Sequence, residues 1–119
     1  MSLLNDSEYE QLSELALEDI LNAAGVLEKG RAIFELARRS RNDEKRLKIV
    51  LDRINNSQNL NSRTVGIVSI SHWGVAGLLE ANTPRAREAV QMLLDRRSEP
   101  DRSNLIDFLE SASLMNRLR

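Results

Sequence analysis

Apolar residues recur every three or four positions along most of the chain, which is the spacing of one face of an amphipathic helix. This pattern predicts six helical segments, which cover about residues 7–25, 27–39, 43–54, 64–81, 84–97 and 101–117. Thr83 and Pro84 supply an N-cap and a first helical residue for the fifth segment. The polar stretch NNSQNLNS at 55–62 is expected to be a loop.

The segment at 64–81 is the most apolar of the six. Residues 64–79 contain no charged side chain, and a helix that is apolar nearly all round belongs in the centre of a protein. The β-branched residues at 65–70 make a strand the alternative, although no second strand is evident to satisfy its backbone hydrogen bonds. The fold class expected is all-α: a compact orthogonal or hairpin-type bundle of five to six helices around a buried central helix (64–81). We expect a single helical domain over 1–119.

Candidate chemistry centres on His72 and Trp73, the only histidine and the only tryptophan in the chain. A catalytic histidine needs a nucleophile and an orienting carboxylate, but Glu80, the nearest carboxylate on the same predicted helix, is about 12 Å away by helix rise. A metal site needs further His or Cys ligands, and the chain has no Cys. We therefore interpret His72 as a hydrogen-bonded core residue and Trp73 as core packing. No catalytic residue, no metal ligand and no cofactor is expected.

The chain also lacks sequence features of membrane targeting. The N-terminal residues MSLLNDSEYE have neither the basic start nor the apolar core of a signal peptide. The charge-free run at 64–79 is too short and too polar to span a bilayer. These features predict a soluble, cytoplasmic protein without a membrane partner.

The net charge of −1 hides an uneven distribution of charges. Residues 1–28 carry seven acidic side chains and no basic one, whereas residues 29–63 carry ten basic side chains and four acidic ones. Opposed segments of this kind can serve an external partner. They can also pair with each other inside the fold, and this second interpretation is favoured because it needs no partner.

The densest group of basic side chains lies at 38–48 and could contact nucleic-acid phosphates. Its members are Arg38, Arg39, Arg41, Lys45, Arg46 and Lys48. Helix-end electrostatics explain much of this cluster, because Arg38 and Arg39 fall in the last turn of a predicted helix, where cations complement the helix dipole.

The stretch LLEANTPRAREAVQMLLDRR at 78–97 contains a second candidate for nucleic-acid contact. It resembles the helix-turn-helix of winged-helix regulators of the GntR type, in which a similar run opens the recognition helix. The resemblance rests on Thr83, Pro84, Arg87, Glu88 and Ala89. It implies that Arg85, Arg87 and Gln91 face bases or phosphates. Arg87 lies one residue later after the proline than in the family, and a helix, in place of the family's two-stranded wing, is expected to follow.

Our leading interpretation is a non-enzymatic α-helical protein–protein interaction module that acts as an adaptor, a regulator or a complex subunit and associates with itself as a homo-oligomer. It follows from the missing catalytic set, the glycine- and serine-rich apolar helix and the opposed charges. Leu114, Met115 and Leu118 are candidate interface residues, which would be left exposed for the partner if the last predicted helix is only partly covered. The alternative is a helix-turn-helix-like nucleic-acid-binding regulator that uses the helix at 84–97 and the basic cluster at 38–48.

Overall fold

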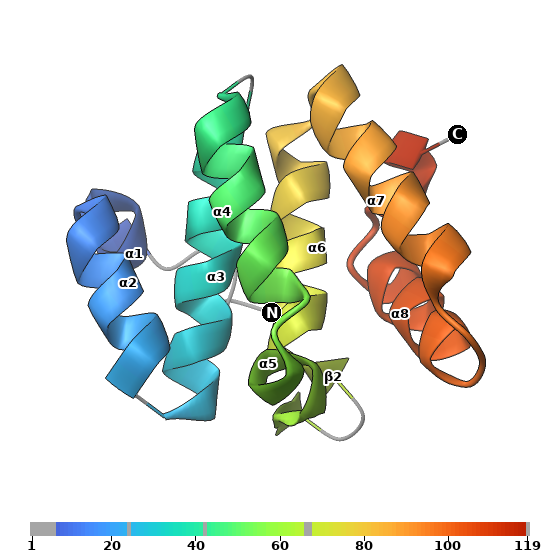
Figure 1. Cartoon of the computed structure of the whole chain (residues 1–119), viewed down its shortest axis with the longest axis horizontal. Helices are drawn as coiled ribbons and strands as arrows, with labels where there is room; N and C mark the ends of the chain where they lie inside the picture. Colours follow the sequence, from blue (N-terminus) through green and yellow to red (C-terminus); the bar gives the residue numbers. More distant parts are fainter. Residues whose placement is uncertain (1–6, 24, 42, 66–67, 119) are drawn as a thin grey trace.

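Helices account for most of the chain that the computed structural model describes, which is residues 7–23, 25–41, 43–65 and 68–118 (Figure 1). In chain order the elements are α1 (Ser7–Gln11), α2 (Glu14–Ala23), α3 (Val26–Ser40), α4 (Glu44–Ile54), α5 (Ser57–Asn61), β1 (Arg63–Val65), β2 (Val68–Ser69), α6 (Ile70–Ala81), α7 (Pro84–Arg96), α8 (Asp101–Ser111) and the 3-10 helix η2 (Met115–Leu118). The predicted all-α class is confirmed. Among the described helices, none has both the length and the apolar character needed to cross a membrane.

Helices α3 and α6 pack against each other at the centre of the molecule and share the largest contact between any two elements. Helix α2 covers one side of α3, and α4 contacts both α3 and α6. Figure 1 shows α4 in front of α3, and it shows α7 and α8 on the right, on the side of α6 away from α2. Helices α2, α4 and α7 each keep one face toward solvent, and the candidate surfaces described below lie on these faces.

Helix α6 is the buried central helix that the apolar pattern predicts, with every residue of 70–79 buried. Two glycines let α3 and α6 approach closely. A Cβ atom on Gly77 would overlap the backbone carbonyl oxygen of Phe34, and a Cβ atom on Gly30 would lie 2.9 Å from Cδ1 of Trp73. Packing therefore explains why these helices contain glycine, although glycine lowers helix propensity by about 1 kcal/mol relative to alanine.

His72 and Trp73 lie in the core, as the sequence predicts. His72 is 4% exposed, and its Nδ1 accepts a hydrogen bond of 3.1 Å from the backbone N–H of Ser69. The Ser69 hydroxyl accepts one of 3.4 Å from the backbone N–H of His72, so the two residues form a capping box at the start of α6. The His72 ring stacks on Phe108 of α8 with centroids 5.8 Å apart, and Trp73 meets the same ring edge-on at 5.2 Å.

The start of the central helix differs from the predicted helix over 64–81, because α6 begins at Ile70. Before it, β1 and β2 pair antiparallel, with Arg63 opposite Ser69. Strand β1 is therefore the partner strand that is not evident in the sequence. It satisfies backbone groups of β2 that an isolated strand would leave unpaired. The β propensity of this stretch prevails over its helical pattern.

Two further boundaries differ from the predicted ones. The predicted first helix is divided into α1 and α2, because the hydroxyl of Ser13 accepts a hydrogen bond of 3.1 Å from the backbone N–H of Ala16 and begins a new helix. The predicted loop at 55–62 contains the short helix α5. Its first turn is capped by Asn56, whose side-chain oxygen accepts a hydrogen bond of 2.9 Å from the backbone N–H of Gln58.

Candidate interaction surface

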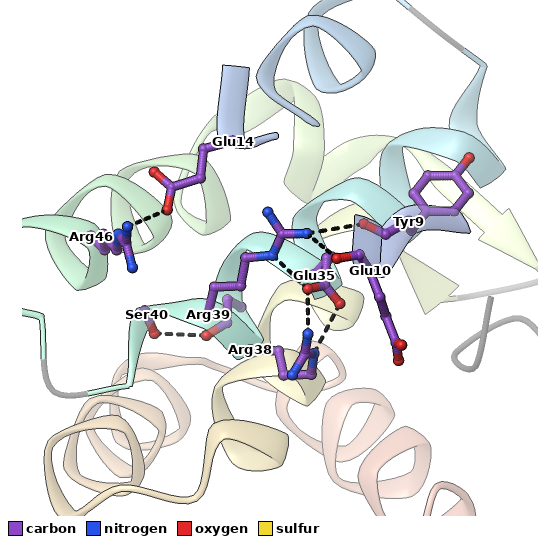
Figure 2. A network of polar contacts seen from close by, with 9 residues as sticks. Tyr9, Glu10, Glu14, Glu35, Arg38, Arg39, Ser40 and Arg46 are labelled. Carbon is purple, nitrogen blue, oxygen red and sulfur yellow. Dashed lines mark hydrogen bonds and ion pairs between the residues drawn. The ribbon is translucent and has the colours of Figure 1, made fainter. Parts of the chain in front are cut away.

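The acidic N-terminal segment and the basic middle segment pair with each other inside the fold. Glu14 of α2 lies 2.7 Å from Arg46 of α4, an ion pair shown in Figure 2. Glu18, one turn further along α2, lies 2.7 Å from Arg53. The favoured interpretation of the charge asymmetry is therefore confirmed. Because all four side chains remain partly exposed, each pair is worth at most about 1 kcal/mol, and its main effect is to hold α2 beside α4.

The carboxylate of Glu35 on α3 is the centre of a buried ionic network (Figure 2), and the residue is 2% exposed. Arg38 donates from Nε to one carboxylate oxygen at 2.9 Å and from Nη2 to the other at 2.5 Å. Arg39 donates from Nε at 2.6 Å. The hydrogen bond to Glu35 raises the pKa of Arg38 above its ordinary value. Two guanidinium groups therefore compensate a carboxylate that would be unfavourable to bury alone.

Arg39 also joins α1 to α3. Its Nη2 donates to the backbone carbonyl oxygens of Tyr9 at 3.1 Å and of Glu10 at 2.8 Å, near the C-terminal end of α1. A cation at this end complements the helix dipole and supplies donors for carbonyl groups that the helix leaves unpaired. The guanidinium of Arg31 adds a cation–π contact with the Tyr9 ring at 5.5 Å. Arg38 and Arg39, two of the predicted phosphate contacts, are thus engaged within the chain.

The other members of the basic cluster lie at the surface. Arg46 is the ion-pair partner of Glu14. Arg41, which follows α3 with a φ of 37°, is exposed, as are Lys45 and Lys48 on α4. None of these three forms a salt bridge with another described residue. They are the part of the cluster that an external anion could reach.

Helix α7, which the GntR resemblance marks as the recognition helix, begins where the sequence predicts. The hydroxyl of Thr83 accepts a hydrogen bond of 3.2 Å from the backbone N–H of Ala86, and Pro84 is the first helical residue. The guanidinium of Arg85 forms a two-pronged ion pair with Glu44 of α4, with nitrogen–oxygen distances of 2.6 and 2.9 Å. Hydrogen bonding to Glu44 raises the pKa of Arg85.

The other two predicted nucleic-acid contacts of α7 are also engaged within the chain. Arg87 donates from Nη1 to the backbone and side-chain oxygens of Asn82, at 3.1 and 3.0 Å. Gln91 donates to the carboxylate of Asp95 at 3.0 Å. Helix α8 follows α7, as the sequence predicts, and the described strand pair precedes α6. The elements after α7 therefore differ from the two-stranded wing of the GntR type.

An apolar hollow opens between α2 and α4, where the two helices are joined by their ion pairs. It has a volume of about 470 Å³ and is lined by Leu15, Leu36, Ile49 and Val50. Leu15 is 73% exposed and Ile49 is 42% exposed, so two large apolar side chains of this lining stand in water. The region is termed the α2–α4 surface, which consists of the hollow and its charged lining residues. These are Glu14, Glu18, Arg46 and Arg53.

A smaller hollow of about 150 Å³ lies between α4 and α7. Its apolar lining includes Leu47, Leu51 and Leu93. Met92, which is 46% exposed, is the exposed large apolar side chain of this lining. The second hollow therefore offers less apolar space than the one between α2 and α4.

The C-terminal apolar residues pack inward. Leu114 is 4% exposed and belongs to the core, while Met115 and Leu118 are partly buried against it. Arg117 holds this segment against α6 by donating to the backbone carbonyl oxygen of Leu79 at 3.0 Å. The expectation that these residues remain exposed is thus corrected for Leu114, because the chain after α8 folds back over the bundle.

The contact residues predicted from the sequence do not include Leu15, Ile49 and Met92. The sequence does indicate that their side chains are exposed, because each lies outside the apolar stripe of its own helix. In α4, for example, the stripe through Leu47 and Val50 is buried, whereas Ile49 lies off this stripe and is exposed. An apolar residue on the solvent face of an amphipathic helix marks a candidate contact surface.

His72 is a buried core residue, and its contacts stabilise the fold. Its ring accepts a hydrogen bond from Ser69 and stacks on Phe108, as described above. In the part of the chain that the structure describes, no three His, Asp or Glu side chains are grouped so as to hold a metal ion.

Comparison of the chain with protein-family models, with curated proteins and with solved structures finds no match. The resemblance to the GntR type therefore has no support beyond the residues at 83–89 that suggest it.

Proposed function

We propose that this chain is a non-enzymatic α-helical protein–protein interaction module that associates with itself and acts through the α2–α4 surface. The observation that carries this proposal is the exposure of Leu15 beside an apolar hollow of about 470 Å³. Fully removing a leucine side chain from water is worth about 1.5–3 kcal/mol. Contiguous exposed apolar surface with a polar rim is typical of sites where proteins associate.

The charged residues of the α2–α4 surface support the same function. A polar rim around an apolar centre is the usual anatomy of a protein interface. Here the ion pairs Glu14–Arg46 and Glu18–Arg53 connect the two helices that form the hollow. A surface held in one arrangement before binding loses less conformational freedom when a partner arrives, which favours association.

A nucleic-acid-binding regulator is the second candidate, and the exposed cations Arg41, Lys45 and Lys48 favour it. The remaining predicted contacts disfavour it, because they already donate to groups of the chain itself. These are Arg38, Arg39, Arg46, Arg85, Arg87 and Gln91. Binding a phosphate through Arg85, for example, would require it to share or leave its ion pair with Glu44.

A nucleic-acid titration at several salt concentrations, run beside light scattering, separates the two candidates. We expect no salt-dependent affinity for DNA or RNA, and a scattering mass that rises above 13.5 kDa as the protein concentration increases. Binding in the micromolar range that weakens steeply with salt, by a protein that stays monomeric, would contradict the proposal.

A further inference from the structure

We infer that the partner on the α2–α4 surface is a second copy of this chain. A two-fold axis relates the two copies, and Leu15 of each copy enters the apolar hollow of the other. The inference rests on the proposed function and adds the place and the geometry of self-association.

The α2–α4 surface carries both an exposed large apolar side chain and an open apolar hollow. Leu15 is the most exposed of the large apolar side chains in the described part of the chain. Leu15 is itself one of the residues that line the hollow, together with Leu36, Ile49 and Val50. A two-fold axis brings the same patch of both copies into reciprocal contact. Leu15 of one copy then meets the hollow of the other, and the two-fold axis makes the reverse contact at the same time.

The charges that are not already paired within the chain favour contact of α2 with α4 of the other copy. Glu14 and Glu18 of α2 form ion pairs with Arg46 and Arg53 of the same copy, and Glu44 of α4 pairs with Arg85. The charged side chains of the two helices that form no salt bridge with another described residue are Asp19 on α2 and Lys45, Lys48 and Asp52 on α4. Contact of α2 with α4 of the other copy therefore brings an acidic residue to a helix with an excess of bases, and the two-fold axis makes this contact twice.

The dimensions of the two helices predict a weak dimer. At a rise of 1.5 Å per residue, α2 and α4 are about 15 and 17 Å long, and side by side they are roughly 20 Å wide. This footprint is smaller than the patch of about 800 Å² per partner that a standard stable interface buries. Self-association is therefore expected in the micromolar range or weaker, with monomer and dimer in exchange.

Sedimentation velocity on the whole chain tests the inference. The wild type is compared with L15D and with the matched control M92D, which places the same charge on the smaller hollow. Concentrations from about 5 to about 500 µM span the dissociation constants expected for weak association. We expect a wild-type monomer–dimer equilibrium, a dissociation constant raised by about tenfold or more in L15D because a charge must be buried at the contact, and no change in M92D. Circular dichroism checks that each variant is folded.

Cysteine cross-linking gives a second measurement that does not depend on weakening the contact. The chain has no Cys, so each introduced thiol is unique. Separately prepared L15C and I49C proteins, mixed and mildly oxidised, are expected to form a disulfide-linked heterodimer, in which two thiols lose two hydrogens to the added oxidant. The control mixture of M92C and I49C is expected to remain uncross-linked.

The outcomes separate this inference from the proposed function. A wild-type dimer that L15D leaves intact, with no L15C–I49C cross-link, overturns the inference but retains self-association at another surface. A wild type that stays monomeric over the whole concentration range overturns both the inference and self-association, and makes a different protein the candidate occupant of the hollow. A dimer weakened by L15D and spared by M92D, together with the L15C–I49C cross-link, supports the inference.

Discussion

The guanidinium of Arg39 donates a hydrogen bond of 2.8 Å to the backbone carbonyl oxygen of Glu10, which joins α3 to the end of α1. The same guanidinium binds the buried carboxylate of Glu35 at 2.6 Å. Helix α1 has five residues, which is too short for a helix to be stable by itself in water. Its position therefore depends on tertiary contacts such as this one.

Replacing Arg39 is expected to destabilise the fold. Arg39→Ala removes the hydrogen bonds to Glu35 and to the carbonyl oxygens near the end of α1, so it should lower the free energy of unfolding by about 2–3 kcal/mol. The loss is limited to this range because Arg38 remains as an ionic partner of Glu35. Arg39→Lys retains the charge but has a single nitrogen, which cannot reach Glu35 and Glu10 together, so its stability should be intermediate. Urea denaturation followed by circular dichroism measures both variants. An unchanged midpoint for Arg39→Ala would contradict the role of Arg39 as a link between helices.

The close contact of α3 and α6 predicts different effects for two Gly→Ala substitutions. Gly77→Ala places a methyl group against the backbone carbonyl of Phe34, which cannot move without displacing α3, so we expect a loss of about 1–3 kcal/mol. Gly30→Ala meets the side chain of Trp73, which has more freedom to adjust, and also gains about 1 kcal/mol of helix propensity. Thermal melts should therefore rank wild type and Gly30→Ala above Gly77→Ala. The reverse order would show that the backbone contact at Gly77 does not determine how closely α3 and α6 approach each other.

His72 is expected to contribute to stability. His72→Ala removes the acceptor for the backbone N–H of Ser69 and the ring that stacks on Phe108, so we expect a loss of about 2–4 kcal/mol. Ser69→Ala removes the reciprocal cap alone and should cost about 1 kcal/mol. Calorimetry on both variants tests this order. A His72→Ala protein that melts like the wild type would mean that the ring is not needed for the core.

The start of α8 predicts a pH dependence. The hydroxyl and the backbone N–H of Ser103 donate to the Glu99 carboxylate at 2.7 and 2.8 Å, and these hydrogen bonds lower the pKa of Glu99 below its ordinary value of 4.5. A carboxyl group with a lowered pKa in the folded state stabilises the fold above its ordinary pKa, and this contribution is lost as the pH falls through the lowered value. The stability difference between wild type and Glu99→Gln should therefore shrink on acidification below 4.5.

Ser103→Ala is the matched variant for this prediction, because it removes the hydroxyl that donates to the Glu99 carboxylate at 2.7 Å. Urea midpoints measured across the acidic range should show a pH-dependent difference between wild type and Glu99→Gln, and a smaller one when Glu99→Gln is compared with its parent in the Ser103→Ala background. An equal pH dependence in both backgrounds would contradict the capping role of the Glu99–Ser103 hydrogen bond.

The helices with regular apolar stripes and clear start signals are predictable from sequence. Helix α7 begins at the residue that Thr83 and Pro84 indicate, and α4 buries the predicted stripe through Leu47 and Val50. The start of α6 is not predictable in this way. The stretch before Ile70 suits both a helix and a strand, and the pairing of β1 with β2 decides between them.

The candidate surface is predictable only in part. The distribution of charge predicts that acidic and basic segments meet, but the partners of Glu14 and Glu18 depend on how α2 lies across α4. The exposure of Leu15 likewise depends on which face of α2 is covered by α3. Leu17 and Leu21 are buried, so Leu15, two residues before Leu17, lies on the opposite face of the helix.

Methyl NMR spectra of the whole chain at increasing concentration test self-association through the α2–α4 surface, because they locate the contact without any substitution. If the dimer forms through this surface, the methyl signals of Leu15 and Ile49 shift progressively as the protein is concentrated, while that of Met92 stays constant. Spectra that do not change with concentration, or shifts at Met92 in place of Leu15, would contradict self-association through the α2–α4 surface.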